Sequence, residues 1–137
     1  MIDVDSLSRL ALFADLTRPQ LEAVAHAVNE ERYAKGMRIL REGLSGSAFY
    51  VIVEGEASVQ IGGEERARLR PGDFFGEVSI LTGDAPDADV IAASDELRAA
   101  VLGGPALEPL LLEYPRLAVR MLEIEARRLR SANRWQG

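Results

Sequence analysis

Residues 32–102 consist of short apolar runs interrupted by glycine, and this pattern constrains the fold more than any other feature of the chain. The run Ala48 to Val53 is almost wholly apolar, as expected of a strand that is buried on both faces. Ala57, Val59 and Ile61 instead alternate with polar residues, as in a strand with one face in water. Many short strands joined by tight turns are therefore predicted.

The turns between these runs support the same fold class. Ile61-Gly62-Gly63-Glu64 predicts a two-residue β-hairpin, and the segments 89–93 and 97–102 supply two further strands. Eight or so strands between helical ends indicate a mainly β protein. The expected architecture is a double-stranded β-helix, or jelly-roll barrel, over about residues 31–102.

Both ends of the chain carry helical patterns. The stretch Thr17-Arg18-Pro19-Gln20 has the form of a capping box with proline in the first turn, so helices are predicted over about residues 5–30. Gly103-Gly104-Pro105 ends the barrel, and a C-terminal helical pair is predicted over about residues 105–134. Its second, longer helix is expected to run from about Arg116 to Asn133.

The long C-terminal helix has two neighbouring apolar stripes. The stripe expected to face the barrel is Ala118, Leu122 and Leu129. The second stripe is Leu117, Met121 and Ile124. A single barrel covers only one stripe, so the second predicts a homodimer through this helix.

Composition excludes several classes of protein. The 137 residues fit one domain, residues 1–137, and no apolar run is long enough to span a membrane. The absence of cysteine and of a signal peptide predicts a cytoplasmic protein, and the net charge of −6 argues against nucleic-acid binding by the chain itself. His26 is the only histidine, so neither a histidine metal cluster nor Ser-His-Asp catalysis is available, and no enzyme is predicted.

The segment from Pro71 to Val90 is the candidate ligand site. Gly72 and Gly76 bracket an apolar pair, and Glu77 then precedes an apolar run long enough for about one helical turn. Glycine lets the backbone approach a ligand, and amides at the start of a helical turn suit an anion. The spacing therefore indicates a small phosphate cradle with one acid beside it.

In context, Phe75-Gly76-Glu77-Val78-Ser79-Ile80-Leu81 with Thr82-Gly83 resembles the phosphate-binding cassette of the cyclic nucleotide-binding domain family, of the catabolite activator and protein kinase A regulatory-subunit type. The resemblance runs from about Leu10 to about Leu129. It implies a signalling module whose ligand is cAMP or cGMP. In the family the acid, here Glu77, accepts a hydrogen bond from the ribose 2′-hydroxyl. The implied backbone donors to the phosphate are Gly76, Val78 and Ser79. The C-terminal helix covers the base in the family, which implies roles for Arg128, Ala132 and Asn133.

One departure from the family pattern changes the functional prediction. An arginine after the cassette helix forks onto the cyclic phosphate in the family. Aligned on Ala88-Asp89-Val90, that position is Pro86, and counted one residue further it is Asp87. No Lys or Arg lies between Arg70 and Arg98. Weak or lost binding of cyclic nucleotides is therefore predicted, with regulation through protein contacts or a different ligand.

Several alternatives remain open from the sequence. A substitute cation, drawn from Arg41, Arg68 or Arg128, would give a working cyclic-nucleotide sensor. A second alternative is a transcription regulator of the catabolite-activator kind that is cut short at Gly137. The acidic residues of the loop, interpreted as a solvated surface rather than a cation site, are Asp84, Asp87 and Asp89. Trp135 is a candidate lid for the base or a frayed terminal residue. The protein partner is not identified by the sequence.

Overall fold

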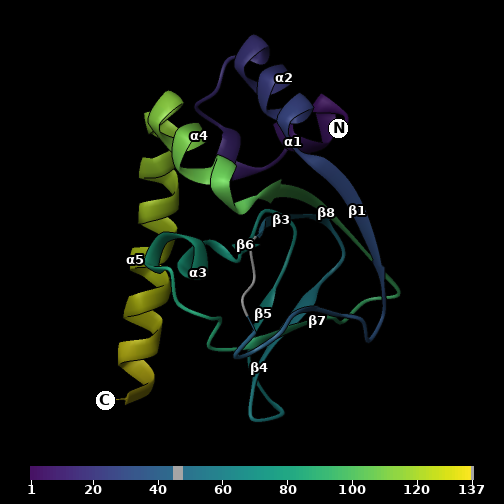
Figure 1. Ribbon diagram of the computed structural model, residues 1–137, viewed down its shortest axis with the longest axis vertical. Helices are drawn as coiled ribbons and strands as arrows, with labels where there is room; N and C mark the ends of the chain where they lie inside the picture. Colours follow the sequence, from purple (N-terminus) through teal and green to yellow (C-terminus); the bar gives the residue numbers. More distant parts are fainter. Residues whose placement is uncertain (45–47, 137) are drawn as a thin grey trace.

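The computed structural model describes residues 1–44 and 48–136, with side chains through residue 132. Its helices lie above the strands and along one side of them (Figure 1). The elements before the cassette helix are α1 (Val4–Ser8), η1 (Ala11–Phe13), α2 (Arg18–Ala27), β1 (Asn29–Ala34), β2 (Arg38–Leu40), β3 (Ala48–Glu54), β4 (Ala57–Ile61), β5 (Glu64–Leu69) and β6 (Phe74–Phe75). The remaining elements are α3 (Glu77–Thr82), β7 (Asp89–Ala92), β8 (Glu96–Gly103), η2 (Gly104–Ala106), α4 (Leu107–Glu113) and α5 (Pro115–Gln136).

The strands pair antiparallel into two four-stranded sheets. One sheet has the order β1-β8-β3-β6 and the other has the order β2-β7-β4-β5. The prediction of a mainly β jelly-roll fold with flanking helices is confirmed. Among the described residues, no strand pairing joins the two sheets into one closed barrel.

The local turn and cap predictions are also confirmed. Ile61 pairs with Glu64, and the two glycines between them have positive φ of 61° and 83°, as a two-residue hairpin requires. At the start of α2 the Thr17 hydroxyl accepts from the Gln20 amide, while the Thr17 amide donates to the Gln20 side chain at 2.9 Å. These groups form the capping box that the sequence predicts.

Two apolar clusters make up the core. The cluster among the strands includes Leu40, Ile52, Leu69, Phe75 and Leu97. The cluster beneath the helices includes Leu12, Val24, Phe74, Leu107 and Met121. Successive strand residues point to opposite faces, so the adjacent residues of β6, Phe74 and Phe75, enter different clusters. The short strand β6 therefore joins the two halves of the core.

The orientation of α5 differs from the prediction. Leu117 and Met121 are only 2% and 4% exposed, because they pack with Leu12 and Phe13 in the helical cluster. The third member of that stripe, Ile124, is half-buried against the same cluster. The stripe that we assigned to a partner is therefore the core-facing one. In the stripe that was predicted to face the barrel, Leu122 and Leu129 are instead exposed to solvent, by 68% and 63%.

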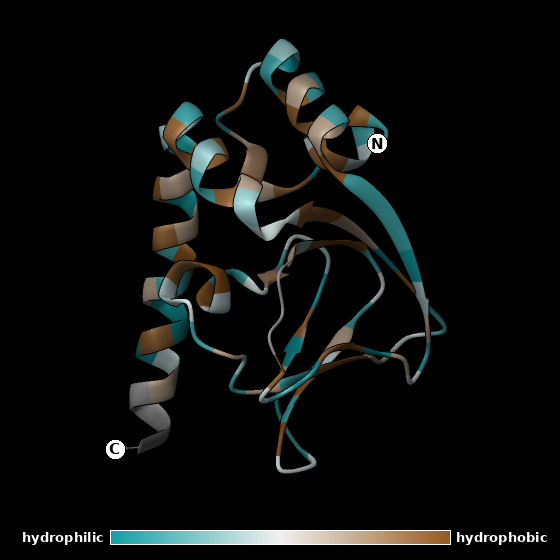
Figure 2. Cartoon of the chain, viewed as in Figure 1, coloured by the Kyte–Doolittle hydropathy of each residue, from teal (hydrophilic) through white to brown (hydrophobic). Residues whose placement is uncertain are grey.

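The exposed face of α5 carries its own apolar row. Val119, Leu122, Ala126 and Leu129 are exposed and lie alternately three and four residues apart. Figure 2 shows hydrophobic bands along this helix, which runs down one side of the molecule. In the part of the chain that the structure describes, no helix is both long and apolar enough to cross a bilayer.

Candidate ligand-binding site

A cleft of about 930 Å³ lies where the cassette, strands β4 and β5, and helix α5 meet. It brings together the predicted site residues Phe75, Gly76, Glu77, Val78, Ser79, Pro86, Asp87, Ala88, Arg128 and Ala132. The side chains of Asn133 and Trp135, also singled out from the sequence, lie outside the described residues. Leu40, Leu69 and Phe75 give the cleft apolar walls, and Phe75 stacks on Tyr50 with ring centroids 4.6 Å apart.

Gly76 sets the start of the cassette helix. It is the N-cap of α3 with φ of 92°, a left-handed conformation that favours glycine. A Cβ atom at this position would lie 2.3 Å from the carbonyl oxygen of Ala48 on β3. The backbone of the cassette is thus pressed against the neighbouring strand, where only glycine fits.

We expect Gly76→Ala to lower the free energy of unfolding by at least about 2 kcal/mol, since it combines left-handed strain with a backbone clash. Gly72→Ala is the matched control, because Gly72 has φ of 94° but a Cβ atom added there would meet nothing within 4 Å beyond its chain neighbours. Urea unfolding of both variants measures the difference. Equal losses for the two would contradict the role assigned to the Ala48 contact.

Glu77 is the buried acid of the site. It is 4% exposed, and its Oε2 atom has no hydrogen-bond partner among the described residues. Its Oε1 atom lies 3.5 Å from Nη1 of Arg128. Burial, reinforced by the charge of Glu125, raises the pKa of Glu77 to about 7, while Arg128 opposes the shift. Glu77 therefore lines the cleft and has one carboxylate oxygen that accepts no hydrogen bond from the described residues.

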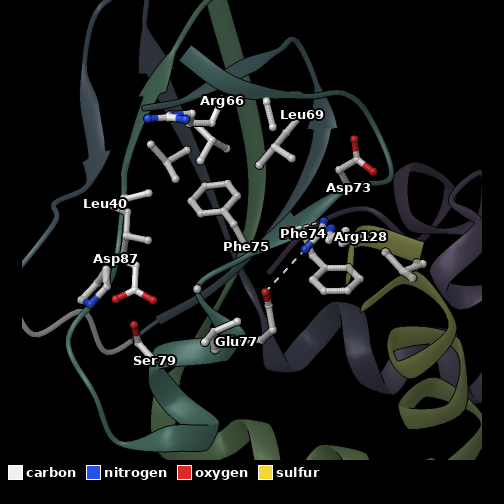
Figure 3. A pocket seen from close by; sticks show the side chains of 18 of the residues that line it. Leu40, Arg66, Leu69, Asp73, Phe74, Phe75, Glu77, Ser79, Asp87 and Arg128 are labelled. Atoms are coloured by element: carbon white, nitrogen blue, oxygen red, sulfur yellow. Dashed lines mark hydrogen bonds and ion pairs between the residues drawn. The ribbon is translucent and has the colours of Figure 1, made fainter. Parts of the chain in front are cut away.

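Arg128 fastens α5 to the cassette (Figure 3). Its Nη2 donates to the carbonyl oxygen of Phe74 at 2.8 Å, and its Nη1 donates to Glu125 at 3.1 Å. The guanidinium carbon lies 4.4 Å from the centroid of the Phe74 ring, within the range of a cation–π contact. One side chain of α5 thus contacts both β6 and the first residue of α3.

The raised pKa of Glu77 predicts a pH dependence of stability. The folded state binds more protons than the unfolded state between pH about 4.5 and about 7, so the free energy of unfolding falls as pH rises through this window. The fall amounts to as much as about 3 kcal/mol. Glu77→Gln should remove this fall, and Glu108→Gln, which changes an exposed glutamate, should keep it. Urea unfolding across the window tests this, and an unchanged slope in Glu77→Gln would contradict it.

The loop between α3 and β7 brings acidic residues to the cleft. Pro86 is buried, and its carbonyl oxygen accepts from the Gly43 amide at 2.9 Å, which fixes the path of the loop. Asp87 is exposed and lines the cleft together with Asp84. In Figure 3, Asp87 and Ser79 lie on one side of Phe75, while Glu77 and Arg128 lie on the other.

Four arginines line the cleft, and the sequence interpretation missed two of them. Arg68 and Arg128 are two of the three candidate substitute cations; Arg41, the third, is not among the described residues that line the cleft. Arg66 and Arg127 also line it. Arg66 lies two residues from Arg68 on β5, a spacing that places side chains on one face, so strand periodicity could have found it.

A family model described as the cyclic nucleotide-binding domain matches residues 30–114, and the chain belongs to this family. A cAMP-dependent protein kinase regulatory subunit from Colletotrichum orbiculare is 37% identical over 109 residues, which are 78% of this chain and 28% of that protein. The chain therefore spans under a third of that relative's length.

Solved structures share the fold. The catabolite activator protein of Thermus thermophilus matches with a TM-score of 0.77 and 29% identity, covering 89% of this chain and 59% of that one. The regulatory subunit of a cAMP-independent protein kinase A from Trypanosoma cruzi, bound to guanosine, has a TM-score of 0.69 and 24% identity. That match covers 80% of this chain and 39% of the other, and at this identity it shows the fold alone.

Proposed function

We propose that the chain is a non-enzymatic regulatory domain whose cleft binds cAMP and cGMP weakly or not at all and takes a ligand of a different class. The observation that carries this proposal is the residue pair at the family's arginine position. Pro86 and Asp87 both line the cleft, so neither the loop path nor burial removes them from the site. Proline has no amide proton to donate, and an ionised aspartate repels a phosphate.

The expected loss of affinity is large. Removing one partner of a buried charge pair costs roughly 2–5 kcal/mol, which is about one and a half to three and a half decades in affinity. Asp84 and Asp87 add repulsion toward an anion, which solvent screens in part. An affinity in the micromolar range would therefore weaken by one or more orders of magnitude.

The acid that we assign to the ribose is placed to accept a hydrogen bond from a ligand. Glu77 is buried, lines the cleft and has an oxygen that accepts no hydrogen bond from the described residues. We assign it the role of the hydroxyl acceptor, with the cassette amides beside it.

The rival proposal, a cyclic-nucleotide sensor with a substitute cation, depends on a free arginine. Arg68 already pairs with Glu56 at 3.4 Å and Glu65 at 2.9 Å. Arg128 is engaged with Phe74 and Glu125. Among the described residues, Arg66 pairs only with Glu64 at 3.8 Å and Arg127 makes no ion pair, so these two are the least engaged candidates.

We expect cAMP and cGMP to bind with dissociation constants no tighter than about 100 μM, which corresponds to micromolar binding less the cost of the missing arginine. Isothermal titration calorimetry of both nucleotides measures this. Low-micromolar binding that Arg66→Ala abolishes would establish the rival sensor instead. Low-micromolar binding that survives Arg66→Ala would also contradict weak binding.

We also propose that the domain acts through a second copy of itself. The row Val119, Leu122, Ala126 and Leu129 has the alternating spacing of a two-stranded coiled-coil seam. Pairing of identical helices about a two-fold axis would cover this row. The row that motivates this dimer is thus a different one from the stripe Leu117, Met121 and Ile124 that the sequence suggested.

A further inference from the structure

We infer that the cleft binds an uncharged nucleoside, with Glu77 and Asp87 accepting hydrogen bonds from its sugar hydroxyls. This inference rests on the proposed function and names the ligand class of the same site. It assigns Asp87 a direct role as an acceptor at the position where the family carries a phosphate-binding donor.

The lining of the cleft has no large excess of acidic or basic residues, which favours a neutral ligand. Its lining contains four acids, Asp73, Glu77, Asp84 and Asp87, and four arginines, Arg66, Arg68, Arg127 and Arg128. A site for an anion or a cation would carry an excess of the opposite charge. The balance leaves hydrogen bonding and apolar contact as the means of recognition.

Glu77 and Asp87 both line the cleft, and both can accept hydrogen bonds. Glu77 is more than nine-tenths buried, and its Oε2 atom has no donor among the described residues. A buried acceptor of this kind needs a hydroxyl or water partner. In Figure 3 Asp87 lies across Phe75 from Glu77, and an ionised carboxylate only accepts hydrogen bonds. A molecule with hydroxyl donors at separate points satisfies both.

The apolar walls of the same cleft suit a base. Leu40, Leu69 and Phe75 are apolar, and Phe75 is held in place by its stacking on Tyr50. A cleft of about 930 Å³ is large enough for a small organic ligand. A planar apolar ring with an attached polyhydroxy sugar matches this combination, whereas a free sugar would leave the apolar walls wet.

The experiment titrates guanosine and adenosine by calorimetry into the wild-type chain and two variants. We expect at least one nucleoside to bind more tightly than about 100 μM, and its 2′-deoxy form to bind at least tenfold more weakly because Glu77 loses a donor. Asp87→Ala should weaken the nucleoside at least tenfold without weakening cAMP, since it removes an acceptor and a negative charge together. Asp95→Ala, a matched change at an exposed aspartate outside the cleft, should alter neither.

The outcomes separate this inference from the proposed function. If neither nucleoside binds at about 1 mM, the inference is wrong, while the weak binding of cyclic nucleotides can still hold. If a nucleoside binds but Asp87→Ala leaves its affinity unchanged, the role of Asp87 is wrong. If cAMP or cGMP binds in the low micromolar range, the proposed function itself is overturned. Circular dichroism of Asp87→Ala confirms that each comparison concerns a folded protein.

Discussion

Replacing Pro86 with arginine and Asp87 with serine is expected to create cyclic-nucleotide binding, or to strengthen it at least tenfold. The planar guanidinium can fork onto two phosphate oxygens, and the second change removes the nearest like charge. Glu77, Val78 and Ser79 of α3 already line the same cleft as Pro86 and Asp87, so the repair adds only the missing donor. Calorimetry with cAMP and cGMP measures the gain.

The structure explains why the loop should tolerate this repair. The loop at Pro86 is held through its backbone, because the carbonyl oxygen of Pro86 accepts from the Gly43 amide, a bond that does not involve the side chain. Pro86→Ala with Asp87→Ser is the control that removes the charge without adding a donor. We expect the control to gain much less than the repaired protein. Adding Glu77→Ala to the repaired protein should weaken binding again. A repaired protein that folds normally but ignores both nucleotides would contradict the assignment of the site.

Leu122→Glu is expected to break the dimer and Met121→Glu to destabilise the fold, although the two residues are adjacent in the sequence. Leu122 is 68% exposed, so its replacement should leave the fold intact and convert a dimer to monomer. Met121 is 4% exposed in the helical cluster. A glutamate there removes apolar packing and buries an unpaired charge, with a loss of at least about 3 kcal/mol in the free energy of unfolding.

Light scattering at tens of micromolar and urea unfolding together test this pair. Glu123→Gln, on the exposed surface of the same helix, is the control for a simple change of charge. Only monomer in the wild-type protein would contradict the dimer. A dimer that survives Leu122→Glu would place the interface elsewhere, and a stable Met121→Glu protein would contradict the packing of α5.

The fold could be predicted because its signals are local. The positive-φ glycines of the β4–β5 hairpin and the reciprocal hydrogen bonds of Thr17 and Gln20 each depend on a few consecutive residues. The cassette likewise forms one continuous segment, so all of its predicted residues line one cleft. Local chemistry of this kind is preserved when the chain folds.

The buried side of α5 could not be predicted, because its two stripes are similarly apolar and lie side by side on the helix. Which one is buried depends on how the helix docks against Leu12 and Phe13, more than a hundred residues away in sequence. The contact of Arg128 with the Phe74 carbonyl is equally non-local, joining residues 54 positions apart. No pattern in either segment encodes such a pairing.

The contact of Arg128 with β6 and Glu77 has a consequence for thermodynamic linkage. A ligand hydroxyl that engages Glu77 acts on the same carboxylate that Arg128 approaches, so occupancy of the cleft and docking of α5 are energetically connected. Linkage is reciprocal: a factor by which the ligand changes the docking equilibrium is the factor by which docking changes ligand affinity. Because a dimer through α5 would also act on that equilibrium, the apparent ligand affinity should vary with protein concentration. Titrations of this domain would then describe a family of binding curves, one for each concentration, rather than a single constant.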